Sequence, residues 1–216
     1  LYTEDHVSTV DHFLSGMGFA RIARSQEDDR DSTLLQHGDV RLVVTSGPAV
    51  QGFLEKHGAG IADIALTCDD VAETRERAVA AGVVGLGAVD GAPAVAGFGD
   101  MRHTLLPATG GEIARIPPGR RWVPEPDAAP GAARTVRLLD HVAVCVEGGR
   151  LSEYADLYAD AFGFSRFSAE YVAVGGQAMD SVVVRSESGG ATFTLVAPDP
   201  GKDPGQLDAF REPNAG

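Results

Sequence analysis

Several kinds of residue are scarce in this sequence, and each shortage excludes a class of protein. Only two of the 216 residues are cysteines, Cys68 and Cys145, which are too few for a disulfide framework and show no CxxC spacing for zinc. No apolar run approaches the roughly 18 residues that a membrane-spanning helix needs, and no signal peptide opens the chain. These absences predict a cytoplasmic protein that has no membrane partner.

Basic residues are also few compared with acidic ones. The chain has 18 Lys and Arg against 31 Asp and Glu, which gives a net charge of −13. Nucleic acids are bound through clustered Lys and Arg, so no nucleic-acid partner is predicted. Aromatic residues make up only 6% of the chain and hydrophobic residues 44%, so we expect a core built from valine, leucine and alanine.

The chain is predicted to alternate short strands with single helices, and the pattern recurs. Residues 5–19 and 150–164 each predict a helix that ends at a glycine, Gly18 or Gly163. Aligning these helices brings "TLLQHGDVRLVVTS" close to "SVVVRSESGGATFTLVAP", and both segments predict a hairpin. A repeat of one strand, one helix and two or three further strands predicts an α+β fold.

The repeats start at residue 1, near Ile61 and at Leu138. Residues 1–116 are therefore predicted to form an N-terminal domain of two repeats, and residues 137–216 the first half of a C-terminal domain. Residues 117–136 contain five of the twelve prolines and predict an interdomain linker. A fourth repeat is missing and the first lacks most of its opening strand, so we expect the chain to be a fragment of a longer protein.

Two histidines lie in predicted strands. In "LLDHVAVCV", residues 138–146, side chains alternate across the strand, so His141 is expected on one face with Leu139, Ala143 and Cys145. The residues alone leave open whether His141 is a metal ligand or a core histidine bonded to backbone or water. His103, in "MRHTLL", has no catalytic partner nearby in the sequence, and we expect it to be structural.

Segments along nearly the whole chain resemble a single family. "HGAGIADIALTCDDVAETRERAVAAG", "GFGDMRHTLL", "LDHVAVCV", "GFSRF", "GGQAMDSVVV" and "DPGQLDAF" resemble the 4-hydroxyphenylpyruvate dioxygenase and 4-hydroxymandelate synthase family. This resemblance implies the vicinal-oxygen-chelate fold, in which repeated βαβββ units form half-barrels around a metal, with the C-terminal domain incomplete in this chain. It also implies a homodimer.

The family binds Fe(II) in its C-terminal domain through two histidines and one glutamate, and the first of these histidines matches His141. A triad of this kind leaves positions for a 2-oxo acid and O2. The second histidine would open the fourth repeat and the glutamate would lie on its last strand, and neither position is present here. Asp63 stands at the corresponding position of the N-terminal domain, so no metal is expected there.

The resemblance further implies that the substrates are 4-hydroxyphenylpyruvate and O2. Two products are open: 4-hydroxymandelate, from hydroxylation of the benzylic carbon, and homogentisate, from hydroxylation of the ring. Relatives that form homogentisate have a proline and an asparagine where this sequence has Thr194 and Val196. We therefore favour 4-hydroxymandelate.

Ser181 and Gln206 resemble a hydroxyl and an amide that line the substrate pocket in the family. The plainer interpretations are a strand serine at 181, a β-forming threonine at 194 and a surface residue at the start of a helix at 206. A non-catalytic protein of the same fold that only binds small molecules also stays open, because fold alone does not determine function.

Overall fold

The computed structural model of the chain describes residues 1–108, 116, 118–126 and 136–214. The sequence "GFGDMRHTLLPATGGEIARIP" predicts two strands joined by a Gly-Gly turn, and most of the second strand lies outside these residues, as does much of the predicted linker. The described chain divides into two compact units, one from residues 1–64 and 117–139 and one from residues 65–116 and 140–216. The division separates the first two repeats from each other, so it differs from the predicted domain boundaries, which stay a prediction.

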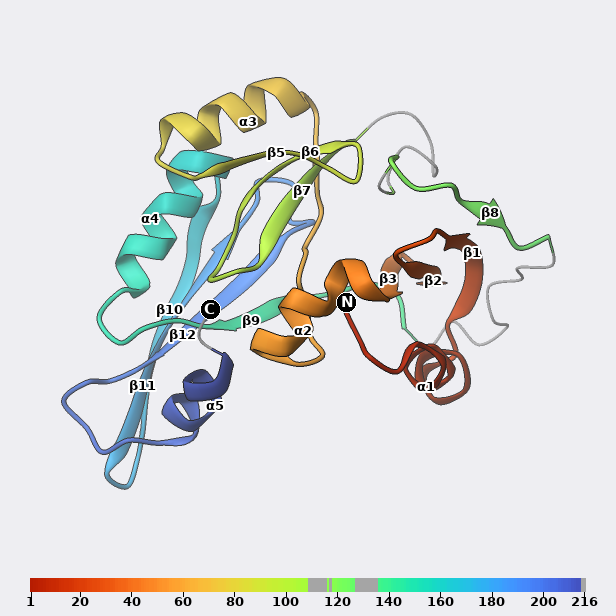
Figure 1. Cartoon of the computed structure of the whole chain (residues 1–216). Helices are drawn as coiled ribbons and strands as arrows, with labels where there is room; N and C mark the ends of the chain where they lie inside the picture. Colours follow the sequence, from red (N-terminus) through yellow and green to blue (C-terminus); the bar gives the residue numbers. More distant parts are fainter. Residues whose placement is uncertain (109–115, 117, 127–135, 215–216) are drawn as a thin grey trace. The chain divides into compact units, whose positions relative to one another are not determined.

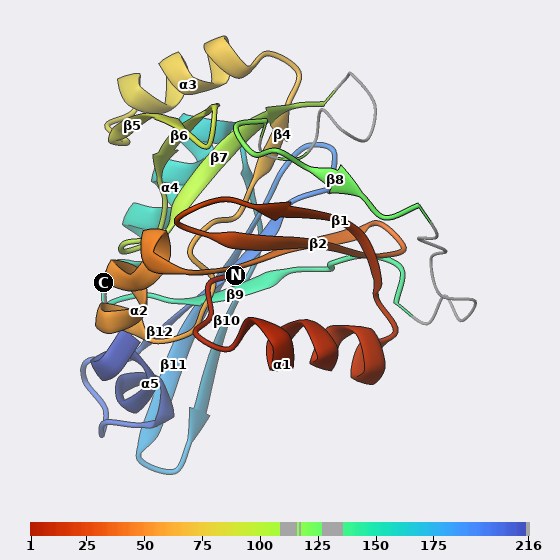
Figure 2. The same ribbon diagram turned by 45° about the vertical axis from the view of Figure 1, so that its right-hand side comes forward.

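The first unit is a four-stranded sheet with a helix packed on it. The sheet has the order β3-β2-β1-β8, and Figure 2 shows α1 alongside it. The elements of this unit are α1 (His6–Asp11), η1 (His12–Gly16), β1 (Ala20–Gln26), β2 (Asp31–His37), β3 (Val40–Ser46), η2 (Pro48–Val50), α2 (Gln51–His57) and β8 (Val123–Pro124). The hairpin predicted around "HGD" is therefore present as β2 and β3.

Local chemistry explains where α1 begins and what it covers. The Asp5 carboxylate caps the helix by accepting a hydrogen bond from the Ser8 N–H at 3.0 Å. The helix then buries Val10 against Phe19, Leu35 and Val44, which form the core of this unit. Burial of such apolar side chains is the main favourable contribution to folding.

Part of the predicted linker belongs to this sheet. β8 pairs antiparallel with β1, and Arg120 is buried just before it. The Arg120 guanidinium donates hydrogen bonds to the hydroxyls of Ser32 and Thr45, the latter at 2.8 Å. Composition predicted an extended connection here, but a buried arginine and a strand pairing fasten this stretch to the unit.

The second unit contains two successive strand–helix–three-strand repeats, which confirms the predicted repeat and the α+β class (Figure 1). The first repeat consists of β4 (Leu66–Cys68), α3 (Val71–Ala80), β5 (Gly85–Val89), β6 (Ala92–Ala96) and β7 (Arg102–Pro107). The second consists of β9 (Val142–Cys145), α4 (Leu151–Phe162), β10 (Ser165–Val174), β11 (Gln177–Arg185) and β12 (Thr192–Pro198), and α5 (Gln206–Asn214) follows.

Both repeats of the second unit have the same topology. The sheets have the orders β4-β7-β6-β5 and β10-β11-β12-β9. In each, the opening strand pairs parallel with the last strand, and the other pairings are antiparallel. Helices α3 and α4 contact each other in this unit. No helix among the described residues is both long and apolar enough to cross a membrane.

The strand predicted at residues 138–146 is shorter in the structure. Leu138 and Leu139 are 59% and 58% exposed, and β9 contains only Val142–Cys145, the residues that pair with β12. His141 precedes the strand and its side chain is 49% exposed. The expectation that Leu139 and His141 are buried strand residues is therefore wrong, because the pairing with β12 begins only at Val142.

Candidate active site

One face of the β10-β11-β12-β9 sheet carries most of the predicted site residues. Along β12 the burial alternates strictly, so that Phe193, Leu195 and Ala197 are buried while Thr194 and Val196 are half-buried. In β11, Val182 and Val184 are buried and Ser181 and Val183 are half-buried. Alternation of this kind gives the sheet one covered and one more open side.

The strand register places the half-buried residues next to one another. Ser181 of β11 pairs with Val196 of β12, and Val196 pairs with Cys145 of β9. One step along β12, Thr194 pairs with both Val183 and Ala143. Paired residues lie on the same face of a sheet. We call the face formed by Ala143, Cys145, Ser181, Val183, Thr194 and Val196 the open face.

The structure thus brings three predicted substrate residues, Ser181, Thr194 and Val196, onto a single surface. It offers hydroxyls beside apolar side chains, a combination suited to a ligand with an aromatic ring and a polar end. The Ser181 hydroxyl donates a hydrogen bond to the Glu170 carbonyl at 3.2 Å, so its oxygen still has capacity to accept one.

Cys145 was not among the predicted substrate residues, although strand alternation places it on this face. Burial raises the pKa of its thiol, and the nearby Arg211 opposes that rise. The thiol is therefore neutral at physiological pH, and it adds a small, weakly polar group next to Val196.

His141 lies directly before β9, on the chain that leads into the open face. Its Nδ1 is 2.7 Å from the Asp140 carboxylate, which fixes Nδ1 as the donor and leaves Nε2 as the nitrogen that can bind a metal. A metal-binding histidine is commonly oriented through its second ring nitrogen by a carboxylate, a backbone carbonyl or a water molecule.

The described residues do not form a complete metal site. Among them, no three His, Cys, Asp or Glu side chains gather closely enough to hold an ion. An imidazole oriented by a carboxylate fits one ligand of an Fe(II) triad. In such a triad, the other two ligands would have to come from residues outside those that the structure describes.

Gln206 lies apart from the strands, at the first position of α5. Its side chain is exposed, and the turn before it is closed by the Gly205 N–H, which donates to the Asp208 carboxylate at 2.8 Å. Because α5 contacts β12, the helix lies near the sheet, but the role of Gln206 in a pocket stays a prediction.

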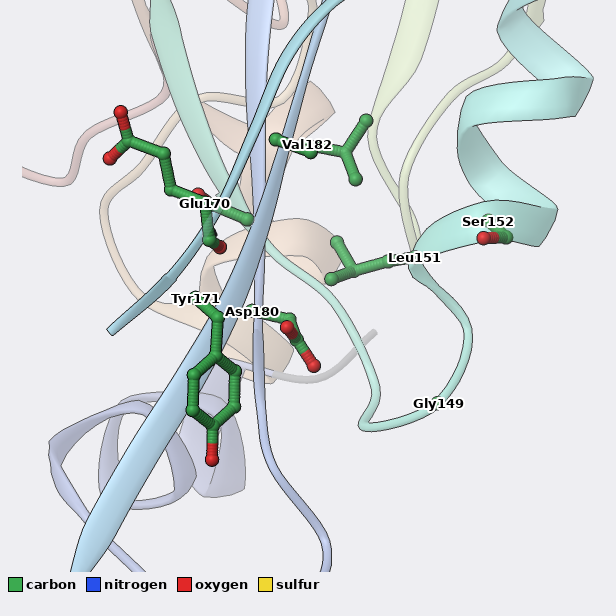
Figure 3. A pocket seen from close by; sticks show the side chains of 9 residues that line it. Gly149, Leu151, Ser152, Glu170, Tyr171, Asp180 and Val182 are labelled. Carbon is green, nitrogen blue, oxygen red and sulfur yellow. Dashed lines mark hydrogen bonds between the residues drawn. The ribbon is translucent and has the colours of Figure 1, made fainter. Parts of the chain in front are cut away.

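A cavity of about 490 Å³ lies on the other side of this sheet, beside the start of α4. Leu151, Tyr171, Asp180 and Val182 line it, and Ser181 also borders it. Figure 3 shows Glu170 pointing away from Leu151 and Val182. The Tyr171 hydroxyl is bonded to Asp199 at 2.9 Å. Since this cavity faces α4 and the predicted residues Thr194 and Val196 face the other way, we do not assign the site to it.

His103 has the structural surroundings that the sequence led us to expect. It is fully buried in β7, and its Nε2 is 2.6 Å from the Tyr158 hydroxyl. Its ring also contacts Phe98, Phe162 and Phe193.

Residues 1–102 match the model of the Glyoxalase/Bleomycin resistance protein/Dioxygenase superfamily. A triple mutant of 4-hydroxymandelate synthase from Streptomyces coelicolor is 41% identical, with a TM-score of 0.87 over 100% of this chain and 66% of that one. This chain therefore spans slightly less than two thirds of that protein.

A second solved structure is similar in fold. It is a fusion protein of a xylose isomerase-like TIM barrel and 4-hydroxyphenylpyruvate dioxygenase, 21% identical, with a TM-score of 0.74 over 90% of this chain and 31% of that one. At this identity the match supports only the assignment of the fold. Together with the repeat topology, the comparisons establish the vicinal-oxygen-chelate fold that the sequence predicted.

Proposed function

Because this chain belongs to the glyoxalase/bleomycin resistance protein/dioxygenase superfamily, we propose that it is part of an Fe(II)-dependent dioxygenase that makes 4-hydroxymandelate. The reaction takes 4-hydroxyphenylpyruvate and O2 and gives 4-hydroxymandelate and CO2, with one oxygen atom of O2 entering the benzylic position and the other the new carboxylate formed from the 2-oxo carbon. The observation that carries this proposal is the 41% identity to 4-hydroxymandelate synthase along the whole chain.

We assign the metal-binding role to His141. In this proposal its Nε2 binds Fe(II), and Asp140 holds the ring through Nδ1 at 2.7 Å. The other two ligands come from outside the described residues. When bound, the iron would supply the centre at which the 2-oxo acid and O2 are held and oxygen is reduced.

We assign substrate positioning to the open face. Thr194 and Ser181 offer hydroxyls to the polar groups of the substrate, and Val196 offers an apolar contact for its ring or side chain. An amide at position 196 would instead provide a hydrogen-bond partner, which we associate with homogentisate formation. Gln206 is proposed to approach the substrate from α5.

The proposal extends to organisation and location. It divides the polypeptide into an N-terminal metal-free domain, residues 1–116, and a catalytic domain that begins at residue 137. It places the protein in the cytoplasm as a homodimer. Size-exclusion chromatography with light scattering tests the dimer, because a protomer mass in solution would contradict it.

The test is product analysis with the full-length polypeptide, supplied with Fe(II), 4-hydroxyphenylpyruvate and O2. Since 4-hydroxymandelate and homogentisate are isomers, they are separated by chromatography against both standards. We expect 4-hydroxymandelate from the unchanged protein, and loss of both Fe(II) binding and product from His141→Ala. Homogentisate as the main product would refute the proposed reaction.

Two further variants test the open face directly. Val196→Asn is expected to raise the share of homogentisate, because the added amide can bind a polar group of the substrate. Val174→Asn makes the same change at a side chain of β10 that is 74% exposed, and it should leave the product share unchanged. If the unchanged protein neither bound Fe(II) nor consumed O2, a non-catalytic binding protein would be the better assignment.

A further inference from the structure

A buried hydrogen bond joins the two repeats of the second unit. His103 in β7 is 0% exposed and Tyr158 in α4 is 2% exposed, and the His103 Nε2 lies 2.6 Å from the Tyr158 hydroxyl. Polar groups that are buried this fully are costly unless they are paired, so each group holds the other in place. The bond therefore fixes the position of α4 relative to β7.

A packed set of aromatic rings connects the two hydrogen-bonded side chains to the β10-β11-β12-β9 sheet. Phe193 of β12 contacts both partners, with ring centroids 5.7 Å from His103 and 5.4 Å from Tyr158. Phe98 stacks on Tyr158 at 4.7 Å and also touches Phe193 at 5.6 Å. Because closely packed interiors have few voids, displacement of one ring is passed on to its neighbours.

Phe193 lies directly behind the open face. It is 2% exposed, and the next residue of β12 is Thr194, whose side chain is on the opposite side of the sheet. Phe193 also pairs with Val142, the residue that follows His141. A shift of Phe193 would therefore move both Thr194 and the beginning of β9.

We propose that His103 and Tyr158 form a positioning pair. From the buried side of the sheet, the pair fixes the position of β12 and therefore of the open face, to which the substrate is proposed to bind. The proposal rests on the function proposed above. Neither residue touches the substrate in this scheme; they act through Phe193 on the strand that carries Thr194 and Val196. The pair thereby makes the repeat from β4 to β7, which lies in the predicted metal-free domain, a determinant of the reaction's outcome.

Two other observations agree with this role. The Arg77 guanidinium of α3 donates hydrogen bonds to the Asp160 and Ala159 carbonyls at 2.7 Å and 3.2 Å, so α4 is also held at its C-terminal end. Burial raises the pKa of Tyr158 well above its ordinary value, so the phenol keeps its proton and the bond to His103 persists at physiological pH.

The first test measures the ratio of 4-hydroxymandelate to homogentisate formed by the full-length, iron-loaded protein. This ratio does not depend on how much of the enzyme is folded, so a purely structural loss leaves it unchanged. Tyr158→Phe and His103→Leu are expected to raise the homogentisate share several-fold, because small displacements of a reacting group change the outcome. His103→Gln, whose amide reaches a similar place, should retain the original ratio.

Tyr154→Phe is the matched control. It removes a tyrosine hydroxyl from the same helix, and Tyr154 is only half-buried and contacts Arg150 through its ring at 5.1 Å. This variant is expected to keep the original ratio. If Tyr158→Phe and His103→Leu also kept it, the positioning role would be overturned.

The second test needs neither iron nor activity. Backbone amide resonances of the 216-residue chain are compared by NMR between the unchanged protein and Tyr158→Phe, which retains the aromatic ring. We expect the amides of Thr194 and of Val142–Cys145 to shift, and Tyr154→Phe to leave them in place. Unshifted amides in Tyr158→Phe would reject the positioning pair, whereas a protein that makes neither product would reject only the proposed function.

Discussion

Replacing Gly38 with alanine tests how the chain is fastened shortly before the proposed iron ligand. Gly38 forms the turn between β2 and β3 with φ at +59°. A Cβ atom there would lie 2.7 Å from the Arg137 carbonyl oxygen and 2.8 Å from that of Val136. Both neighbours are backbone atoms, so alanine cannot be accommodated by rotating a side chain.

Two hydrogen bonds hold residues 136 and 137 against this turn. The Asp39 N–H donates to the Arg137 carbonyl at 2.8 Å. The Val136 N–H donates to Nε2 of His37 at 3.3 Å, while Nδ1 of His37 donates to the Met17 carbonyl at 3.0 Å. Moving residues 136 and 137 away from an added Cβ would break both bonds.

The expected cost of Gly38→Ala follows from these contacts. An alanine in the left-handed region costs about 1–2 kcal/mol, and each lost hydrogen bond about 1 kcal/mol. The free energy of unfolding of the first unit should therefore fall by about 3–4 kcal/mol.

Gly18→Ala serves as the control in the same unit. Its φ is +72°, and the nearest atom to an added Cβ is the His37 Cε1 at 3.4 Å, an ordinary contact. It should therefore cost only the backbone strain, about 1–2 kcal/mol.

Urea unfolding followed by fluorescence measures both variants. Trp122 is the single tryptophan of the chain and belongs to the first unit. Hydrogen exchange of the Asp39 amide then shows whether its bond to Arg137 is lost. Equal destabilisation by Gly38→Ala and Gly18→Ala, with the Asp39 amide still protected, would refute the steric argument.

Three other changes are expected to have distinct effects. Phe193→Ala should lower the free energy of unfolding by about 3–5 kcal/mol because it leaves a cavity in place of a buried ring. Phe167→Ala, at a side chain that is 65% exposed, should lower it little. Urea unfolding followed by circular dichroism measures both variants. Burial raises the folded-state pKa of Tyr158 above 10.0, so its contribution to stability is complete below pH 10 and is lost at higher pH. Tyr158→Phe should therefore reduce the loss of unfolding free energy at alkaline pH. The same dependence of unfolding free energy on pH in both proteins would contradict this expectation. Asp140→Asn should weaken Fe(II) binding to the full-length protein about 10–100-fold, which calorimetric titration measures, and unaltered affinity would argue against His141 as an oriented ligand.

The repeat and its hairpins could be read from the sequence because their causes are local. Alternating side chains and glycine turns predicted β2 with β3 and β11 with β12. Thr194 and Val196 were predicted from the resemblance alone. The pattern also placed His141 inside the strand, and this was wrong because strand length depends on the partner. β12 pairs with Val142–Cys145 only, and the alternation of neighbouring side chains cannot predict where this pairing begins.

The sequence by itself determined the repeat, the α+β class and the alternation that gives the sheet a covered and an open face, because these depend on residues close together in the chain. Only the tertiary structure decided that Arg120 of the predicted linker is buried and bonded to Ser32 and Thr45, and that His103 meets Tyr158 at 2.6 Å. A charged residue among prolines predicts exposure, and two polar residues so far apart in sequence carry no pattern that pairs them. Such contacts arise from packing between repeats, where burial forces each polar group to find a partner.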